Sequence, residues 1–261
     1  MNRILNTATT REEEAGAPRT TPPARGFGWR RLQLAAALAT LASFLIPMLI
    51  ERSLEPFLMS MAAPVVVGLL VRARWPRVGA VWLGIASLGL LLSSAPFLPQ
   101  PLTHPESTAD FIPLLIFTVS TLAGSFAAIP SFRESARSAG PAGAPRRIAA
   151  SASVVIIAGA VWSMVAAMGV TSVPAAAADV RIVTEALEFL PASIDAQGGT
   201  VSIHVTNLDA TRHTFTIDGL GVDLNVPPNT TQRITFSAEP GTYRFYCRPH
   251  APDMNGELIV R

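Results

Sequence analysis

Five long apolar stretches in the first part of the chain decide what it can fold into. Each is close to the roughly 17–25 residues that a helix needs to cross the hydrocarbon core of a bilayer. None contains an internal Asp, Glu, His or Arg. The mean hydropathy of +0.39 is too high for an ordinary soluble protein. We therefore expect five membrane-spanning helices, at residues 32–50, 56–71, 79–95, 111–130 and 148–171.

Arginines indicate how these helices are oriented. If every stretch crosses once, three segments on one side hold 13 arginines, whereas loops 51–55 and 96–110 on the other side hold only Arg52. Cytoplasmic segments carry the excess of positive charge. The sequence thus predicts a cytoplasmic N-terminus and, because the number of crossings is odd, an extracytoplasmic C-terminal part. The 13 arginines are Arg3, Arg11, Arg19, Arg25, Arg30, Arg31, Arg72, Arg74, Arg77, Arg133, Arg137, Arg146 and Arg147.

Composition divides the chain into four segments. Residues 1–30 are rich in Thr, Pro, Ala, Glu and Arg and are expected to be a disordered cytoplasmic tail. We expect a five-helix transmembrane region at 31–172, a linker at 173–178 and an extracytoplasmic domain at 179–261.

The fifth apolar stretch has a second interpretation. Arginines precede it, and the small residues of 174–178 follow it, as in a signal peptide. Cleavage there would release a soluble C-terminal domain. A permanent anchor is the alternative that the length of the stretch favours.

From about residue 179 the apolar period changes to two, which is typical of half-buried strands. Turns rich in Gly, Pro and Asn separate the strands. This spacing predicts a small antiparallel β-sandwich or barrel. The clearest alternating stretches are 201–205, 213–217, 232–236, 243–247 and 257–260.

The distribution of charge argues against a nucleic-acid partner. Residues 1–178 carry 14 arginines and 8 acidic residues, whereas residues 179–261 carry 6 arginines and 10 acidic residues. The positive charge therefore belongs to the membrane half, where topology explains it, and we expect the lipid bilayer as its partner.

The donor residues of the C-terminal part form the set that copper prefers. Cys247 is the only cysteine, which excludes an intramolecular disulfide, a tetracysteine zinc site and a two-cysteine dinuclear copper centre. One thiolate, two imidazoles and a weak thioether suit a mononuclear blue-copper site. The two-residue period of 243–247 turns the cysteine inward at the end of its strand. We predict His213, Cys247, His250 and Met254 as the ligands of one copper ion.

The stretch from Tyr246 to Gly256 resembles the copper loop of the cupredoxins, the plastocyanin and azurin family. Its Cys-x-Pro-His is a form seen in plastocyanin-like members, and its His-x-x-x-Met in azurin-like ones. The pattern from Phe189 through Asn207 to the first histidine is also similar, and the resemblance covers residues 179–261. It implies a Greek-key β-sandwich in which His250 lies at the surface and is the route for electrons.

Two positions depart from the family pattern. Thr214 stands where members often have Asn, and Arg248 where they often have Ser or Thr. We expect the Thr214 hydroxyl to tie the two ligand loops together. We expect Arg248 to lower the pKa of the Cys247 thiol, and its charge favours a higher copper potential.

Other polar residues have weaker interpretations. His204 has the parity opposite to its strand's apolar face and is expected to be solvated, and His104 is expected to have no partner in its outer loop. Arg212 and Arg248 each adjoin a ligand. They are either ordinary solvated arginines or, by hypothesis, steer an acidic redox partner at the copper edge.

Methionines in the apolar stretches have two interpretations as well. Apolar helix packing is the one favoured by their surroundings, and a soft Cu(I) passage towards the C-terminal domain is the other. The residues are Met48, Met59, Met61, Met164 and Met168.

Together these patterns predict a membrane-anchored copper protein that carries single electrons outside the cytoplasm and is not an enzyme. The expected partner is an unidentified redox protein or copper acceptor. Three alternatives stay open: a non-redox copper delivery protein, an accessory receptor of a copper transporter, and a fold that has lost copper and serves as an interaction module.

Overall fold

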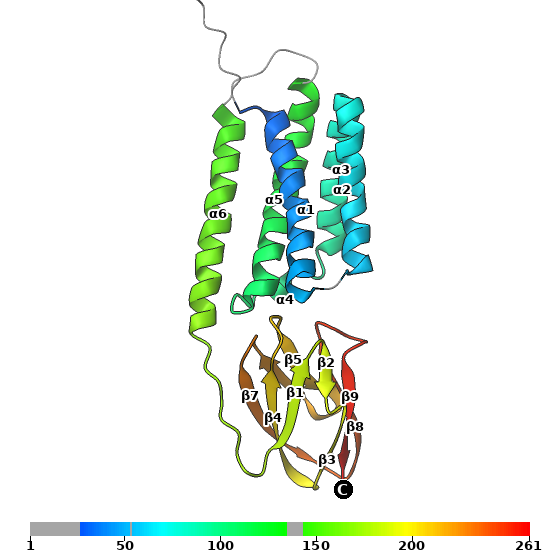
Figure 1. The fold of residues 1–261 in the computed structure, drawn as a ribbon, viewed down its shortest axis with the longest axis vertical. Coiled ribbons are helices and arrows are strands. Elements are labelled where there is room, and N and C mark those ends of the chain that lie inside the picture. Colours follow the sequence, from blue (N-terminus) through cyan, green and yellow to red (C-terminus); the bar gives the residue numbers. More distant parts are fainter. Residues whose placement is uncertain (1–26, 53, 135–142) are drawn as a thin grey trace, which may run out of the picture.

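A helical bundle and a β-domain are stacked end to end along the long axis of the molecule (Figure 1). This computed structural model describes residues 27–52, 54–134 and 143–261. The disordered tail predicted at 1–30 falls almost entirely outside the described residues, and residues 29 and 30 begin the first helix.

Five helices among the described residues are long and apolar enough to cross a membrane, as the sequence predicted. Proline is the first residue of α2 and of α3, where its missing N–H costs no hydrogen bond. A sixth, short helix, α4, lies in the loop 96–110. The helices are α1 (Trp29–Glu51), α2 (Pro56–Arg74), α3 (Pro76–Ser94), α4 (Pro99–Leu102), α5 (Thr108–Glu134) and α6 (Gly143–Met168).

Small residues let the helices approach closely. A Cβ added to Gly124 of α5 would meet Ser87 of α3 and Ala36 of α1. The hydroxyls of Thr40 and Ser120 share a hydrogen bond of 2.8 Å between α1 and α5. Small residues and hydroxyl pairs at such contacts are typical of helix association in a bilayer. Helix α6 lies at the edge of the bundle (Figure 1), where its Gly159 packs against Leu115 of α5.

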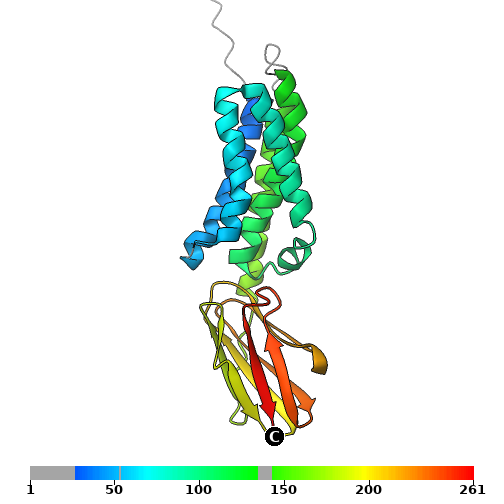
Figure 2. The same ribbon diagram turned by 90° about the vertical axis from the view of Figure 1, so that its right-hand side faces the viewer.

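The β-domain is a sandwich of two sheets and lies below the bundle in Figure 2. One sheet has the order β2-β1-β4-β7 and the other β3-β9-β8-β5-β6, and a short 3-10 turn, η1 (Asp218–Leu220), follows β5. The strands are β1 (Val180–Glu185), β2 (Glu188–Leu190), β3 (Ser193–Ala196), β4 (Gly199–Asn207), β5 (His213–Ile217), β6 (Val222–Val226), β7 (Thr231–Ala238), β8 (Gly241–Tyr246) and β9 (Asn255–Val260).

The predicted sandwich is confirmed, but its sheets are mixed and not antiparallel throughout. β1 pairs with β4 in parallel, and β3 pairs with β9 in parallel. Partners that run in parallel cannot be joined by a tight hairpin. The alternating pattern within each strand carries no information on such long-range pairing.

One apolar core fills the space between the sheets and extends to the loop between β8 and β9. The ring of Phe245 lies 4.9 Å from that of Phe215 and 5.1 Å from that of Phe189, measured between centroids. Cys247 and Met254 belong to the same cluster and are 0% and 1% exposed. The loop is therefore anchored in the core at both ends.

We expect Phe245→Ala to destabilise the β-domain by about 3–5 kcal/mol, because it removes the ring at the centre of this aromatic cluster and leaves a cavity. Thermal unfolding followed by near-ultraviolet circular dichroism measures the effect. Arg244→Ala, on the exposed face of the same strand, is the matched control and is expected to shift stability by about 0.5 kcal/mol or less. Equal effects of the two changes would contradict this account of the core.

Candidate metal centre

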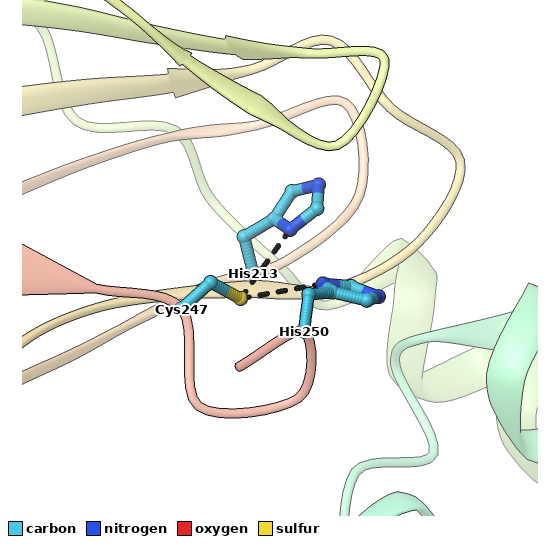
Figure 3. Close-up of side chains that lie close together, drawn as sticks. All are labelled: His213, Cys247 and His250. Atoms are coloured by element: carbon cyan, nitrogen blue, oxygen red, sulfur yellow. Dashed lines mark hydrogen bonds between the residues drawn. The ribbon is translucent and has the colours of Figure 1, made fainter. Parts of the chain in front are cut away.

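Three predicted donors converge at the end of the β-domain that faces the helices (Figure 3). Nδ1 of His213 lies 3.5 Å from Sγ of Cys247, and Nδ1 of His250 lies 3.3 Å from it. All three donor atoms are within 4.8 Å of one another. A thiol and two imidazoles at this separation fit the donor set and spacing of a mononuclear copper site.

Backbone hydrogen bonds shape the loop that carries two of these donors. The N–H of His250 donates to Cys247 O at 3.2 Å, and the N–H of Met254 donates to His250 O at 3.1 Å. The N–H of Cys247 donates to Met254 O at 3.0 Å and closes the loop. The loop therefore holds its own geometry between β8 and β9.

Met254 lies next to Cys247 through this backbone contact, and its side chain is buried in the core. The structure thus brings the fourth predicted ligand to the base of the loop. Coordination by its thioether stays a prediction.

Thr214 ties the two ligand segments together, as the sequence predicted. Its hydroxyl accepts the N–H of Arg248 at 2.8 Å. Its own N–H donates to Sγ of Cys247 at 3.4 Å. Threonine therefore joins β5 to the loop after β8 at the position where asparagine is common in the family.

Asp209 is a site residue that the sequence reasoning missed. Its Oδ2 lies 2.8 Å from Nε2 of His213. A proton held there on Nε2 leaves Nδ1 free to bind a metal and fixes the orientation of the ring. The sequence feature that points to Asp209 is the turn that begins at Asn207. There the backbone N–H of Asp209 donates to Oδ1 of Asn207 at 2.9 Å, as in an Asx turn.

Asn207 organises the same segment from inside the domain. It is 1% exposed, and its Nδ2 donates to the carbonyl oxygens of Thr211, Val226 and Pro227. A buried amide with its hydrogen bonds satisfied rigidifies its surroundings. Asn207 thus fixes the path of the chain from β4 to His213.

Burial sets the protonation of the donors. It lowers the pKa of His250 to about 4 and also lowers the pKa of His213. Both imidazoles are therefore neutral near pH 7, which is their metal-binding form. Burial raises the pKa of the Cys247 thiol, against the opposing hydrogen bond from Thr214. Metal binding must then displace the thiol proton.

The expected effect of Arg248 on this thiol was wrong. The Arg248 guanidinium is paired with two carboxylates, at 3.2 Å from Asp223 and 3.9 Å from Asp218. The positive charge that lowers the pKa of the Cys247 thiol comes instead from Arg212.

Arg212 is neither solvated nor part of an exposed edge, contrary to both interpretations of the sequence. It is 5% exposed, and burial lowers the pKa of its guanidinium. The backbone N–H of Arg212 donates to Oδ2 of Asp110 at 3.1 Å. Nη1 of its guanidinium donates to Oδ1 of Asn225 at 2.9 Å. Asn225 in turn donates to Glu106 at 3.3 Å. These contacts join the end of the β-domain that holds the three donors to the segment at the start of α5.

The ring of His250 consequently faces the bundle (Figure 3). It lines a cavity of about 330 Å³ together with Phe97, Pro101, Asp110 and Arg212. The family resemblance implied that His250 lies at the surface of the protein. Here it lies at the surface of the β-domain, but residues of loop 96–110 cover this edge.

Two further histidines lie differently from expectation. His204 is 6% exposed, and its Nε2 lies 2.9 Å from Val173 O, because the segment after α6 runs along the outer face of its sheet. His104 does have a partner, since its Nδ1 lies 2.9 Å from Glu106.

Comparison with known proteins identifies the β-domain. Residues 154–260, less than half of the chain, match the family model of the cupredoxin-like domain. The chain therefore carries a cupredoxin-like domain at its C-terminal end, and the match begins within α6. This supports copper binding or electron transfer in general.

Several solved structures are similar to this part of the chain. A reduced amicyanin mutant is 19% identical, with 33% of this chain and 86% of amicyanin covered and a TM-score of 0.29. An oxidised amicyanin mutant is 20% identical, with 33% and 86% covered and the same TM-score of 0.29. The Cu(I)-bound metal-binding domain of the Cu(I)-exporting P-type ATPase of Streptococcus pneumoniae is 21% identical, with 32% and 84% covered and a TM-score of 0.29.

We expect Asp209→Asn to weaken copper binding about 10- to 100-fold, because it removes the carboxylate that orients His213. Competition with a chromogenic copper chelator measures the affinity. Asp195→Asn, which alters an exposed carboxylate paired with Arg261, is the control and is expected to leave the affinity unchanged. An unchanged affinity in both variants would show that Asp209 has no part in the site.

Proposed function

We propose that this protein is a membrane-anchored type 1 copper protein that carries single electrons on the extracytoplasmic side. Its one copper ion is held by His213, Cys247, His250 and Met254. The observation that carries the proposal is the convergence of one thiol and two imidazole nitrogens within 4.8 Å at the end of a cupredoxin-like domain.

The surroundings of the donors suit one-electron chemistry. Copper bound here would supply a couple between its +1 and +2 states. The chain keeps the donors in place, since β5 carries His213, Asp209 holds its ring, and Thr214 joins it to the thiol. A site that changes little between two oxidation states transfers electrons with little rearrangement.

An electron carrier fits the site better than an enzyme. Cys247 and His213 are both 0% exposed, so only the edge at His250 is open to approach. An electron crosses one imidazole ring, whereas a substrate needs an open coordination position. An acceptor protein for electrons or for copper is the partner that this edge implies.

The contacts between the two domains support the proposed topology. Glu106 and Asp110, both within 96–110, contact the β-domain directly. The arginine-rich ends of the helices lie at the opposite end of the bundle, where Arg72 donates to Gln33 at 2.6 Å. Loop 96–110 and the β-domain thus share the side that is poor in arginine, as an extracytoplasmic location requires.

Copper reconstitution of the full-length chain tests the electron-carrier proposal. We expect Cu(II) to produce an intense visible thiolate-to-copper absorption band and a paramagnetic resonance spectrum of a type 1 site. Cys247→Ser is expected to abolish the band, whereas Arg244→Ala, on the exposed face of β8, leaves it intact. A colourless site that holds only Cu(I) would favour copper delivery instead.

Membrane location is tested with a C-terminal epitope tag. We expect a single full-length band in the membrane fraction, with the tag accessible to protease added outside intact cells. An N-terminal tag on the same chain is the control and is expected to be protected. A shorter tagged fragment in the secreted fraction would instead support cleavage near residues 174–178.

A further inference from the structure

A second cavity lies at the outer end of the helical bundle, beside the one that contains His250. Its volume is about 370 Å³, within the range of small-molecule sites. The outer ends of α1, α2 and α5 supply most of its wall, and Thr211 of the β-domain closes it from the other side. Four phenylalanines line it: Phe44, Phe57, Phe97 and Phe117.

The cavity is reached from the surface of the bundle that faces lipid in the proposed topology. Phe57 and Phe97 are 63% and 73% exposed, so they form an open rim. Phe44 and Phe117 are buried, with ring centroids 5.6 Å apart, and form the inner wall. A planar apolar molecule would enter from the bilayer and lie against aromatic rings.

Asp110 gives this largely apolar cavity a charged end. It is the only charged residue among the described residues that line the cavity. Its hydrogen bonds from the hydroxyl of Ser107 and the N–H of Arg212 both go to Oδ2. An ionised carboxylate only accepts hydrogen bonds and has two oxygens, so Oδ1 can accept a donor from a ligand. Because the Arg212 charge already acts opposite Asp110, a neutral hydroxyl suits this end better than a cation.

The two cavities share part of their walls. Phe97, Pro101 and Asp110 line both the apolar cavity and the cavity that contains His250. A ligand with its hydroxyl at Asp110 would therefore lie one layer of side chains from the metal-ligand edge.

We propose that the apolar cavity binds a lipophilic aromatic molecule of the hydroquinone class, with a ring hydroxyl donating to Asp110. The chemical class of the ligand follows from two features of the cavity. Its aromatic lining fits an apolar ring, and the Asp110 carboxylate fits a hydrogen-bond donor on that ring. The ligand is a small-molecule partner for the copper site, so its role rests on the proposed function. Binding of the ligand does not rest on that function, because the cavity is complete without copper.

Binding is measured by calorimetry with the full-length, copper-free chain in lipid nanodiscs under anaerobic conditions. The probe is tetramethylhydroquinone, and the matched control ligand is its dimethyl ether, which has the same ring and no donor. We expect saturable binding at one site, with the ether about ten-fold weaker or worse. Equal binding of the two compounds would overturn the proposal and mark the cavity as a groove for acyl chains only.

Three variants of the same chain sharpen the test. Asp110→Asn is expected to weaken hydroquinone binding about ten-fold, because the charged acceptor is lost. Ala109→Leu keeps every charge and fills the cavity that Ala109 lines, so it is expected to abolish binding. Glu106→Gln alters the neighbouring contact with Asn225 but not this lining, and it is expected to bind like the native chain.

The outcomes separate this proposal from the proposed function. Hydroquinone binding that Ala109→Leu does not reduce would place the probe elsewhere and overturn the assignment. Absence of saturable binding would overturn it as well, even in a chain that shows the type 1 copper spectrum. Binding with the expected pattern in a chain that lacks this spectrum would support the cavity and contradict the copper proposal alone.

Discussion

The rest of the structure depends on the burial of a single thiol at the end of a strand. Cys247 follows β8 with its side chain in the apolar core, 0% exposed, and it accepts a hydrogen bond from the N–H of Thr214 on β5. This places sulfur between two sheet elements instead of in solvent. Both histidines then approach it from separate segments, one from the start of β5 and one from the loop that Met254 closes.

The sequence predicted what depends on local periodicity and on donor chemistry. Alternation in 213–217 and 243–247 located β5 and β8, and the rarity of cysteine singled out the thiol. It could not predict what depends on contacts between distant segments. His204 has the parity of an exposed residue, yet Val173 covers it. Asp209 is an ordinary acidic loop residue until the fold turns it towards His213.

Arg212 shows most clearly why a charge pattern does not define a surface. Beside a metal ligand, an arginine is readily interpreted as a solvated, steering charge. Here the end of the bundle buries it, and Asp110 accepts its backbone N–H while Asn225 accepts its guanidinium. The cost of burying a guanidinium is offset only by such partners. The arginine therefore belongs to the interface between the domains, which the sequence of either domain alone does not reveal.

This interface gives a physical reason for more helices than an anchor needs. One crossing would hold a domain at the membrane, but it could not form a wall over the His250 edge. Loop 96–110 and the start of α5 form that wall, and α1 and α2 complete the apolar cavity behind it. In the proposed function, the bundle determines which molecules reach the His250 edge. A site approached through the proposed ligand cavity would select partners by their solubility in the bilayer before any contact with His250 is made.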